Sequence, residues 1–411
     1  MTRRVVVTGM AGLCPLGTTW PEVRSHLRDG ISGVSRDDAL GRIAGMKTRL
    51  VAVVPPFTPP ETVPEDRLAH MSRLSLMSVV ATEEALRGAG LLGHELLGSG
   101  RCGISFGSTS GSPPSMGRCA RAVSTETDLG GTEVADFYHA ASHATAASLA
   151  LAFEVRGRVI PTNSACTSGS QGIGMAYESI RDGLQDAMIA GGAEELFPVC
   201  TAVFDILYAT SSRNEEPTRQ PRPFDKDRDG LVVGEGAATL ILEDLGSARR
   251  RGAPILAELR GYATNCDGVH MVAPQEETMY EVMANAAANA GVTPDEIAYV
   301  CAHGTATELG DIAESLATAR FFGRPVPFSS LKSYMGHTLG ACGALEAWCA
   351  IHFLNEGWLA PTLNLTEVDP RCGHLDYLRE VRPLSGTTIM SNNFAFGGVN
   401  TSLILERWTG T

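Results

Sequence analysis

The sequence contains no uninterrupted apolar stretch of about 18 residues, which is the least that a membrane-spanning helix needs. Near the first residues, the apolar run Val5–Val7 gives way at once to Thr8 and Gly9, and so short a run cannot form the core of a signal peptide. We therefore expect a cytoplasmic chain rather than one that spans or crosses a membrane.

Positive charge is scarce, with 33 Lys and Arg residues against 46 Asp and Glu residues and a formal net charge of -13. A general nucleic-acid binder needs a basic face, because its affinity comes from releasing the counterions of the phosphates. The balance argues against that class of protein, although it leaves room for a local basic patch.

Cysteine pairs are missing too, since none of the ten cysteines forms a Cys-x-x-Cys motif. Cys372 and His374 are a lone pair of potential ligands, so the sequence predicts no zinc site and no other metal centre. Scattered free thiols are typical of a reducing compartment, which again favours the cytoplasm.

Aromatic residues make up only 6% of the chain, whereas 45 of its 411 residues are glycine. Apolar residues make up 44% of the chain. A chain of this length commonly forms two or three domains and can bury a large core. The many small residues favour closely packed α/β layers joined by sharp turns.

Strand-like and helix-like segments alternate, which favours the same layered architecture. The stretch 158–195 has the order strand, sharp turn, helix, strand, and the polar stretch from Arg213 to Gly230 predicts a surface loop. Other predicted strands are 3–10, 104–106, 255–259, 297–302, 326–330, 388–392 and 401–406, and other predicted helices are 74–91, 312–322 and 339–355.

Two segments of the chain resemble each other: Gly234–Glu243 reads GEGAATLILE, and Gly397–Glu406 reads GGVNTSLILE. An internal duplication would explain the likeness. Chance would explain it equally well, because Leu-Ile-Leu is common in any strand.

Cys166 lies where a strand-like segment meets a helix-like one, whose buried face is marked by Ile173, Ala176, Tyr177 and Ile180. Unpaired amides and the positive end of the dipole at a helix N-terminus stabilise a thiolate. We therefore expect a lowered pKa for Cys166 and interpret it as a nucleophile. The other nine cysteines lack this setting and are expected to be inert.

His303 and His337 occupy similar glycine-flanked turns, each after a predicted strand and before a predicted helix. The carboxyl ends of strands are where α/β sheets place ligand chemistry. Neutral imidazoles there can donate hydrogen bonds to a developing negative charge. Further along, the turn Asn392–Asn400 can aim a backbone amide at an oxyanion. Phe394 and Phe396 in this turn could line an acyl channel. A simple glycine-rich hairpin between two strands is the alternative.

Together, four segments resemble the β-ketoacyl-(acyl carrier protein) synthases, and most of all the elongating class with one cysteine and two histidines. They are SACTSG around Cys166, HGTATELGD from His303, KSYMGHTLGACG from Lys332 and NFAFGGVN from Asn393. The likeness extends from the first strand to the last. It implies the thiolase-like fold, with two similar α/β halves, 1–250 and 251–411, in five αβαβα layers, and commonly a dimer.

The resemblance also implies roles for single residues. Cys166 matches the acylated nucleophile, and His303 and His337 match the pair that promotes decarboxylation of a malonyl group. Lys332 and Glu346 match the lysine beside the second histidine and the acid that supports it. Thr305 and Thr307 match hydroxyls that bind the phosphopantetheine arm, and Phe396 matches a gating residue whose amide joins that of Cys166 in an oxyanion hole.

The implied reaction is decarboxylative condensation of an acyl group with malonyl carrier protein. It uses no cofactor of its own, because the phosphopantetheine arrives on the carrier. The partners are acyl carrier protein and a second ketosynthase-fold subunit, identical or related. Arg67, His70 and Arg73 resemble part of a carrier-docking surface, and a solvated helix end is the alternative.

Some positions depart from the family pattern. Asn393 and Ala395 stand where Ser and Gly are usual, and Cys342 stands where Ala is usual. Ala395 in particular raises the question of how freely the gating loop moves, because Gly would be more permissive. The motifs resemble those of aryl-polyene ketosynthases more than those of fatty-acid elongation, and the loop Gly107–Ser112 could form part of a straight acyl slot. Ordinary saturated acyl substrates are the alternative.

Three alternatives compete with this interpretation. A non-catalytic chain-length subunit of the same fold usually lacks the nucleophile that is present here. A degradative thiolase carries its nucleophile much earlier and has a second cysteine near the C-terminus. A dinucleotide-binding oxidoreductase is suggested by Val5–Gly9, but Leu13 and Pro15 stand where its glycines belong.

Overall fold

The structure is a computed structural model that describes residues 2–60, 62–69, 71–124 and 132–410. Within these ranges no helix is long and apolar enough to cross a membrane. His70, one of the three residues of the expected docking surface, lies outside the described residues.

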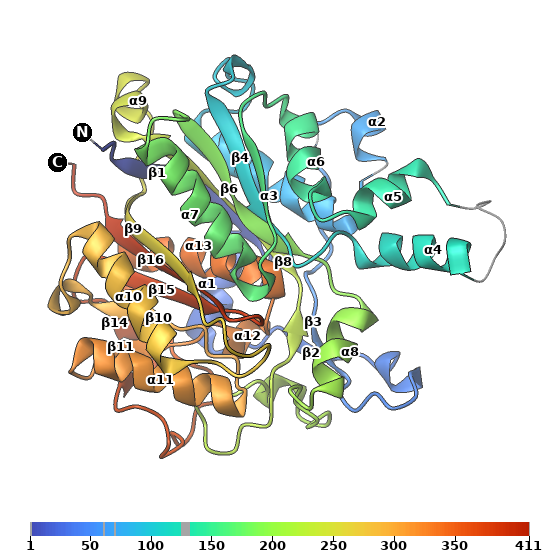
Figure 1. Cartoon of the computed structure of the whole chain (residues 1–411), viewed down its shortest axis with the longest axis vertical. Coiled ribbons are helices and arrows are strands. Elements are labelled where there is room, and N and C mark those ends of the chain that lie inside the picture. Colours follow the sequence, from blue (N-terminus) through green and yellow to red (C-terminus); the bar gives the residue numbers. More distant parts are fainter. Residues whose placement is uncertain (1, 61, 70, 125–131, 411) are drawn as a thin grey trace.

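One mixed sheet of eleven strands runs through the molecule (Figure 1), in the order β13-β11-β10-β15-β16-β9-β1-β8-β6-β4-β5. Its first-half strands are β1 (Val5–Leu13), β4 (Cys102–Gly107), β5 (Val159–Thr162), β6 (Ala187–Glu194) and β8 (Gly236–Asp244). Its second-half strands are β9 (Ala257–Cys266), β10 (Tyr299–Cys301), β11 (Pro327–Ser329), β13 (Asp376–Tyr377), β15 (Thr388–Phe394) and β16 (Val399–Arg407).

The two halves of this sheet share one topology. The order β1-β8-β6-β4-β5 is repeated as β9-β16-β15-β10-β11, with the same sequence of antiparallel and parallel pairings. Within the described part of the chain, the two halves of the sheet are joined where Val5–Val7 pairs with 257–259. The similar segments Gly234–Glu243 and Gly397–Glu406 fall on β8 and β16, which occupy equivalent places, and this favours duplication over chance.

Helices form the other layers (Figure 1). α7 (Ser168–Arg181) and α13 (Cys342–Glu356) lie in the middle and contact strands of both halves. α3 (Arg73–Ala89) and α6 (Ala144–Phe153) cover the outer face of the first half, and α10 (Glu276–Ala290) covers the second, with α11 (Glu308–Phe322) beside it. Since α7 and α13 contact both halves of the sheet, the two halves form separate β layers with these helices between them. The layers therefore follow the expected order α, β, α, β, α.

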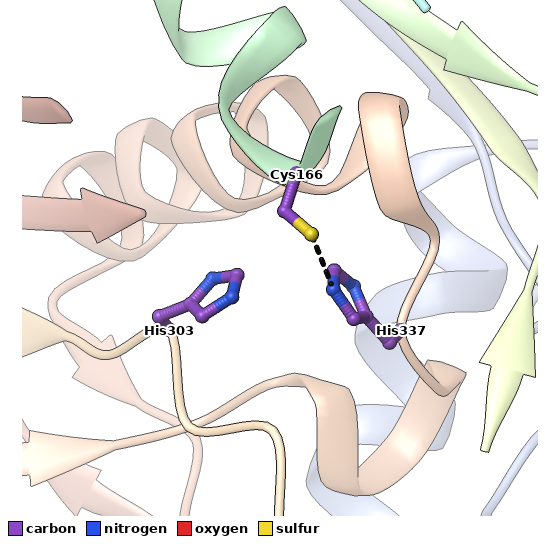
Figure 2. A group of neighbouring side chains, drawn as sticks. All are labelled: Cys166, His303 and His337. Carbon is purple, nitrogen blue, oxygen red and sulfur yellow. Dashed lines mark hydrogen bonds between the residues drawn. The ribbon is translucent and has the colours of Figure 1, made fainter. Parts of the chain in front are cut away.

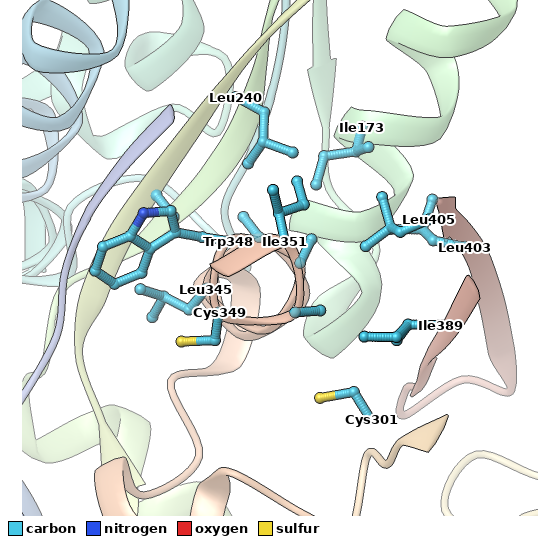
Figure 3. Packing of buried hydrophobic residues seen from close by; sticks show 14 of the residues in the cluster. Ile173, Leu240, Cys301, Leu345, Trp348, Cys349, Ile351, Ile389, Leu403 and Leu405 are labelled. Carbon is cyan, nitrogen blue, oxygen red and sulfur yellow. The ribbon is translucent and has the colours of Figure 1, made fainter. Parts of the chain in front are cut away.

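The centre of the core surrounds α13 (Figure 3). Trp348 and Ile351 of this helix are at most 1% exposed and share one apolar cluster with Leu240 of β8, Ile173 of α7 and Leu403 of β16. Such a helix, apolar on all sides, is stable only when it is buried on all sides. Because α7 and α13 are fixed in this way, the turns at their N-termini are held rigidly next to each other.

The remaining elements are short and lie around this frame. The helices are α1 (Trp20–Asp29), α2 (Glu65–Leu68), α4 (Pro113–Ser124), α5 (Val134–Ala140), α8 (Pro198–Ile206), α9 (Leu245–Arg250) and α12 (Lys332–Met335), and the strands are β2 (Val34–Arg36), β3 (Leu50–Ala52), β7 (Val233–Gly234), β12 (Trp358–Leu359) and β14 (Arg382–Pro383).

The predicted surface loop 213–230 is partly wrong. Gln220, Phe224 and Asp225 are fully buried within it. The carboxylate of Asp225 accepts hydrogen bonds from the backbone amides of Thr366 (2.7 Å) and Glu367 (3.1 Å). A polar composition predicted exposure, but here the polar groups anchor the segment to the second half.

Candidate active site

Cys166 lies in a single tight turn, Ala165–Thr167, between β5 and the N-terminus of α7. Ala165 has a φ of 52°, in the left-handed region that non-glycine residues rarely adopt. The hydroxyl of Ser168 holds the turn, because it accepts from the amide of Ser164 at 2.9 Å and donates to the carbonyl of Ala165 at 2.7 Å. The strained turn directs the thiol away from the helix and into a buried site.

His337 is the direct partner of this thiol, with its Nε2 3.0 Å from Cys166 Sγ (Figure 2). The other ring nitrogen, Nδ1, accepts a hydrogen bond from the amide of Leu339 at 3.2 Å. A neutral imidazole that accepts at Nδ1 carries its proton at Nε2. His337 therefore donates its Nε2–H to the sulfur.

His303 faces the same sulfur from the other side, its ring centroid 5.2 Å from that of His337 and the two planes nearly perpendicular (Figure 2). The Nζ of Lys332 lies 3.1 Å from His303 Nδ1, and an ammonium group can only donate. His303 is therefore also a neutral ring with its proton at Nε2. The two histidines present a matched pair of N–H donors.

A buried ionic network fixes Lys332 in place. Its ammonium group donates to Glu346 Oε1 at 2.5 Å and to the carbonyl of His303 at 2.7 Å. The other carboxylate oxygen of Glu346 accepts from Asn393 Nδ2 at 2.6 Å. Burial opposes the charge on Lys332, but the neighbouring carboxylate of Glu346 raises the pKa of Lys332 overall, so it remains a cation.

The turn that carries His303 is fixed by two buried carboxyl groups. The backbone amides of His303 and Gly304 each donate to Glu314 at 2.7 Å, and the amide of Ala306 donates to Asp311 at 3.1 Å. Burial raises the pKa of Glu314 to about 8 and that of Asp311 to about 6. Neither acid was identified as functional from the sequence, although both lie on the helix that follows the histidine.

Burial also has the largest effect on the pKa values of His303, His337 and Cys166. It lowers the pKa of His303 and of His337 well below the usual value, and the Lys332 charge lowers both further. The expected lowering for Cys166 is wrong: burial raises the pKa of its thiol to about 11, against the smaller opposite effects of Lys332 and of the Phe396 amide. Loss of solvent outweighs the helix N-terminus at this depth.

These side chains open into a cavity of about 370 Å³. Thr305 and Thr307 line it, with their hydroxyls hydrogen-bonded to each other at 2.9 Å. Phe394 and Phe396 line it as well, and the ring of Phe396 packs 5.1 Å from that of Phe204. The catalytic residues and the substrate-binding residues selected from the sequence thus lie in or next to one site.

The departures from the family pattern lie here too. Asn393 binds Glu346, and Cys342 donates from Sγ to the carbonyl of Cys166 at 3.2 Å. The positive φ angles of the gating turn belong to Gly397 and Gly398, so Ala395 imposes no backbone strain. The loop Gly107–Ser112 does not line the described cavity; its Ser108 carbonyl instead accepts from Ser168 behind the nucleophile, at 3.2 Å.

Ligand atoms of Cys166, His303 and His337 lie within 4.8 Å of one another, which is close enough for a metal ion. The cation of Lys332 lies 3.1 Å from His303 Nδ1, and it would repel a second positive charge bound there. That the protein uses no metal remains a prediction.

The expected carrier-docking arginines are occupied. Arg73 donates to both carboxylate oxygens of the buried Glu235, at 3.2 and 2.5 Å. Arg67 binds the carbonyl of Leu151 at 2.9 Å and Glu154 at 3.1 Å. Both arginines thus have acidic partners within the fold while their side chains stay 38% exposed, and the carrier-docking role of this surface stays a prediction.

Comparisons with known proteins agree with this geometry. Family models described as "Beta-ketoacyl synthase, N-terminal domain" and "Beta-ketoacyl synthase, C-terminal domain" match residues 2–248 and 256–366. The chain is 34% identical to 3-oxoacyl-[acyl-carrier-protein] synthase 1 of Haemophilus influenzae, over 99% of this chain and all of the relative. It is also 34% identical to the tetracenomycin polyketide synthase ketoacyl synthase alpha subunit of Streptomyces glaucescens, over 98% of this chain and 97% of the relative.

Among solved structures, a β-ketoacyl synthase from Burkholderia phymatum superposes with a TM-score of 0.97 at 49% identity, covering 99% of this chain and 100% of the other. This match confirms the expected thiolase-like fold, and the similarity extends through both halves of the sheet.

Proposed function

The chain belongs to the β-ketoacyl synthase family, and on that premise we propose that it is a condensing acyltransferase that elongates an acyl chain with malonyl-(acyl carrier protein). The observation that carries the proposal is the buried thiol of Cys166, 3.0 Å from His337 Nε2 and facing a second imidazole donor. The reaction belongs to fatty-acid or polyketide synthesis.

In the first half-reaction, Cys166 Sγ attacks the carbonyl carbon of an acyl thioester. The carbonyl oxygen becomes an oxyanion between the amides of Cys166 and Phe396. In the resting site both amides favour the anionic form of the sulfur, against the larger effect of burial. Collapse of the intermediate breaks the carbon–sulfur bond to the pantetheine. The pantetheine sulfur takes up the proton that Cys166 has lost and leaves as a thiol, while the acyl group stays on Cys166.

In the second half-reaction, malonyl thioester enters the same cavity and loses its carboxylate as CO₂. The electron pair of the broken bond passes to the thioester oxygen, where the Nε2–H groups of His303 and His337 stabilise the enolate. The enolate carbon then attacks the acyl carbonyl and expels Cys166 as a thiolate, which takes up a proton from solvent. The products are a β-ketoacyl thioester, CO₂ and free enzyme.

The neighbouring residues position these groups. Lys332 and Glu346 hold His303 in the tautomer that donates from Nε2. Thr305 and Thr307 bind the pantetheine arm as it passes down the cavity, and Phe394 and Phe396 line the path of the acyl chain. The enzyme needs no cofactor of its own, because the phosphopantetheine arrives on the carrier.

Acyl carrier protein is the substrate-bearing partner, as the name of the Haemophilus influenzae relative indicates for that enzyme. The chain pairs with a second ketosynthase-fold subunit. Its β5 is the edge strand of the large sheet, with no neighbour on its outer side among the described residues, and Val159 at its start is 41% exposed. An unprotected edge of this kind is suited to pairing with another chain. The cytoplasm is its compartment, which the ten free cysteines support.

The acyl group is a conjugated, aryl-ended polyene. The support is the sequence of the motifs around Cys166, Lys332 and Asn393, which resembles aryl-polyene ketosynthases more than fatty-acid elongation enzymes. Competing a polyenoyl carrier thioester against a saturated one of equal length measures the ratio of kcat/KM directly. Preference for the saturated chain would reject the polyene substrate while leaving the condensing mechanism in place.

The general proposal is tested by incubating the protein with acyl carrier thioester and locating the added mass by peptide mass spectrometry. We expect the acyl group on Cys166 and, after malonyl carrier protein is added, a β-ketoacyl product. Cys166→Ala should give neither, and Cys342→Ala serves as the matched control because it removes the neighbouring thiol. Condensation by the Cys166→Ala variant would refute the assignment, and so would an adduct on another cysteine.

A further inference from the structure

The hydroxyl of Thr307 is not used by the helix that it begins. Thr307 is the N-cap residue of α11, and an N-cap threonine ordinarily accepts a hydrogen bond from the amide of the second or third helical residue. In the ranges that the structure covers, its side chain makes no such bond, and its Oγ1 instead lies 2.9 Å from that of Thr305. Both residues line the substrate cavity. The fold therefore omits a helix cap and leaves a pair of hydroxyls available to a ligand.

Gly310, the third residue of α11, leaves the space that this hydroxyl occupies. A Cβ at Gly310 would lie 2.5 Å from Thr307 Oγ1 and 3.5 Å from Thr305 Oγ1, and the first of these distances is well below van der Waals contact. The backbone of Gly310 is helical, so no left-handed conformation calls for glycine here. What requires a residue without a side chain at this position is the hydroxyl pair.

Arg228 fixes the backbone of the same turn from the first half of the chain. Its guanidinium group donates from Nε to the carbonyl of Thr307 at 3.2 Å and from Nη2 to the carbonyl of Glu308 at 2.9 Å. Its Nη1 donates to the carboxylate of Asp369 at 2.7 Å, and the side chain is only 2% exposed. Because these donors lie in one rigid plane, they hold the start of α11 in a defined place at the wall of the cavity.

The turn that leads into Thr307 is strained and is held at a second point. Ala306 has a φ of 65°, and its amide donates to Asp311 at 3.1 Å. The other carboxylate oxygen of Asp311 accepts from the amide of Phe224 at 2.7 Å. Phe224 is fully buried and belongs to the segment that carries Arg228. The first half thus supports this turn both through Asp311 and directly.

We propose that Arg228 and Gly310 are positioning residues for the pantetheine arm. Arg228 fixes the backbone of Thr307, and Gly310 leaves room for its hydroxyl, so the hydroxyl pair faces the cavity before the substrate arrives. The inference rests on the proposed function, which assigns these hydroxyls to the pantetheine arm. The amide groups of pantetheine offer both donors and acceptors to hydroxyls. A pair that is ordered in advance binds them without losing further rotational freedom.

The test measures acyl transfer to Cys166, by intact-protein mass spectrometry, from an acyl-pantetheine thioester and from the S-ethyl thioester of the same acyl group, which has no amide. In Gly310→Ala we expect the KM for acyl-pantetheine to rise about tenfold at an unchanged maximal rate, while kinetics with the S-ethyl thioester stay within about twofold. Alanine favours a helix more than glycine does, so α11 should persist. Gly88→Ala is the matched control, because a Cβ there meets none of the described atoms within 4 Å, and it should change neither donor.

A double-mutant cycle separates this role from a general disturbance. Thr307→Val keeps the shape of the side chain without its hydroxyl and should raise the KM for acyl-pantetheine by a similar factor. Gly310→Ala in that background should add less than about twofold, because the hydroxyl on which it acts is gone. Full additivity, or an unchanged KM in Gly310→Ala alone, would overturn the proposal. An unchanged KM in Thr307→Val would show that the pantetheine role of Thr307 in the proposed function is wrong, and the inference would fall with it.

Arg228→Lys tests the second positioning residue. Lysine keeps a positive charge beside Asp311 and Asp369, but its single ammonium group cannot span both carbonyls and a carboxylate. We expect the KM for acyl-pantetheine to rise about threefold or more, while alkylation of Cys166 by iodoacetamide keeps its wild-type rate. Arg371→Lys is the control, because Arg371 pairs with the same Asp369 but is 55% exposed. Slower alkylation together with equal losses for both donors would mean that Arg228 only maintains the fold, and would overturn its assigned role. If the wild-type protein accepted neither donor, the failure would lie with the proposed function itself.

Discussion

Replacement of Lys332 by methionine should separate the two half-reactions. Lys332 is a positioning residue: its Nζ, 3.1 Å from His303 Nδ1, fixes the tautomer that turns the Nε2–H of His303 toward the substrate. Methionine fills similar space but cannot donate, so the ring is free to rotate or to change tautomer. Loss of one preorganised oxyanion donor typically reduces the rate about 10²–10³-fold. We expect a loss of this size in malonyl decarboxylation and only a small change in acyl transfer to Cys166.

Stability must be separated from catalysis in this experiment. The single variant leaves the carboxylate of Glu346 buried without its cation, and breaking a buried pair typically costs about 3–5 kcal/mol. Lys332→Met combined with Glu346→Gln removes both charges and keeps an acceptor for Asn393, so much of the free energy of unfolding should return. The decarboxylation rate should stay low in this double variant.

The assays are release of labelled CO₂ from malonyl carrier protein and the rate of acyl-enzyme formation followed by intact-protein mass spectrometry. Removing the Lys332 charge should also raise the pKa of His303 toward its ordinary value, since that charge lowers it. If the double variant decarboxylates normally, Lys332 does not act through His303. Equal losses in acyl transfer and decarboxylation would show general collapse of the site.

Three further predictions follow from the buried groups. Because burial raises the pKa of Cys166 to about 11, the thiol is protonated at neutral pH, and its alkylation by iodoacetamide should speed up continuously from pH 7 to 10; a plateau below pH 8 would contradict this. Asn393→Ser should lose the 2.6 Å hydrogen bond to Glu346 and lower the free energy of unfolding by about 1–3 kcal/mol, with Asn285→Ser as an exposed control; equal stability would show that the bond contributes nothing. Burial raises the pKa of Glu314 from 4.5 to about 8, so between these pH values the folded chain holds a proton that the unfolded chain releases. The free energy of unfolding therefore falls as pH rises from 4.5 to about 8. Glu314→Gln should flatten this slope in denaturant titrations from about pH 5 to 8.5.

The sequence predicted the layered fold well because its evidence was local. The strand ending at Cys301, the helix beginning near Arg73 and the turn at Cys166 each carry the apolar spacing and glycine breaks that define them. The equivalence of β8 and β16 was visible as a pair of similar ten-residue segments, both of which end in Leu-Ile-Leu-Glu. The strand order is what separates duplication from chance.

The sequence could not predict effects that depend on depth. The position of Cys166 at a helix N-terminus predicted a lowered pKa, yet its side chain lies among buried residues contributed by segments more than a hundred positions away, and their desolvation reverses the sign. The ion pair of Arg73 with the buried Glu235 was likewise invisible, because the two residues are 162 positions apart in the sequence. Glu314 was missed because a buried carboxyl group that accepts hydrogen bonds from backbone amides leaves no motif in the sequence.

The raised pKa of Cys166 fits a nucleophile that becomes charged only while it reacts. At rest, the thiol is protected from alkylation and oxidation, since the thiolate is the reactive form. When an acyl carbonyl arrives, negative charge moves from the sulfur to the carbonyl oxygen between the Cys166 and Phe396 amides, and His337 donates to the sulfur during its brief anionic state. Once Cys166 is acylated, its sulfur no longer needs that donor. The Nε2–H groups of both histidines then become available for the enolate. The two anions never exist together, so one pair of neutral imidazoles can serve both half-reactions, provided that Lys332 and Leu339 hold both rings in the donor tautomer.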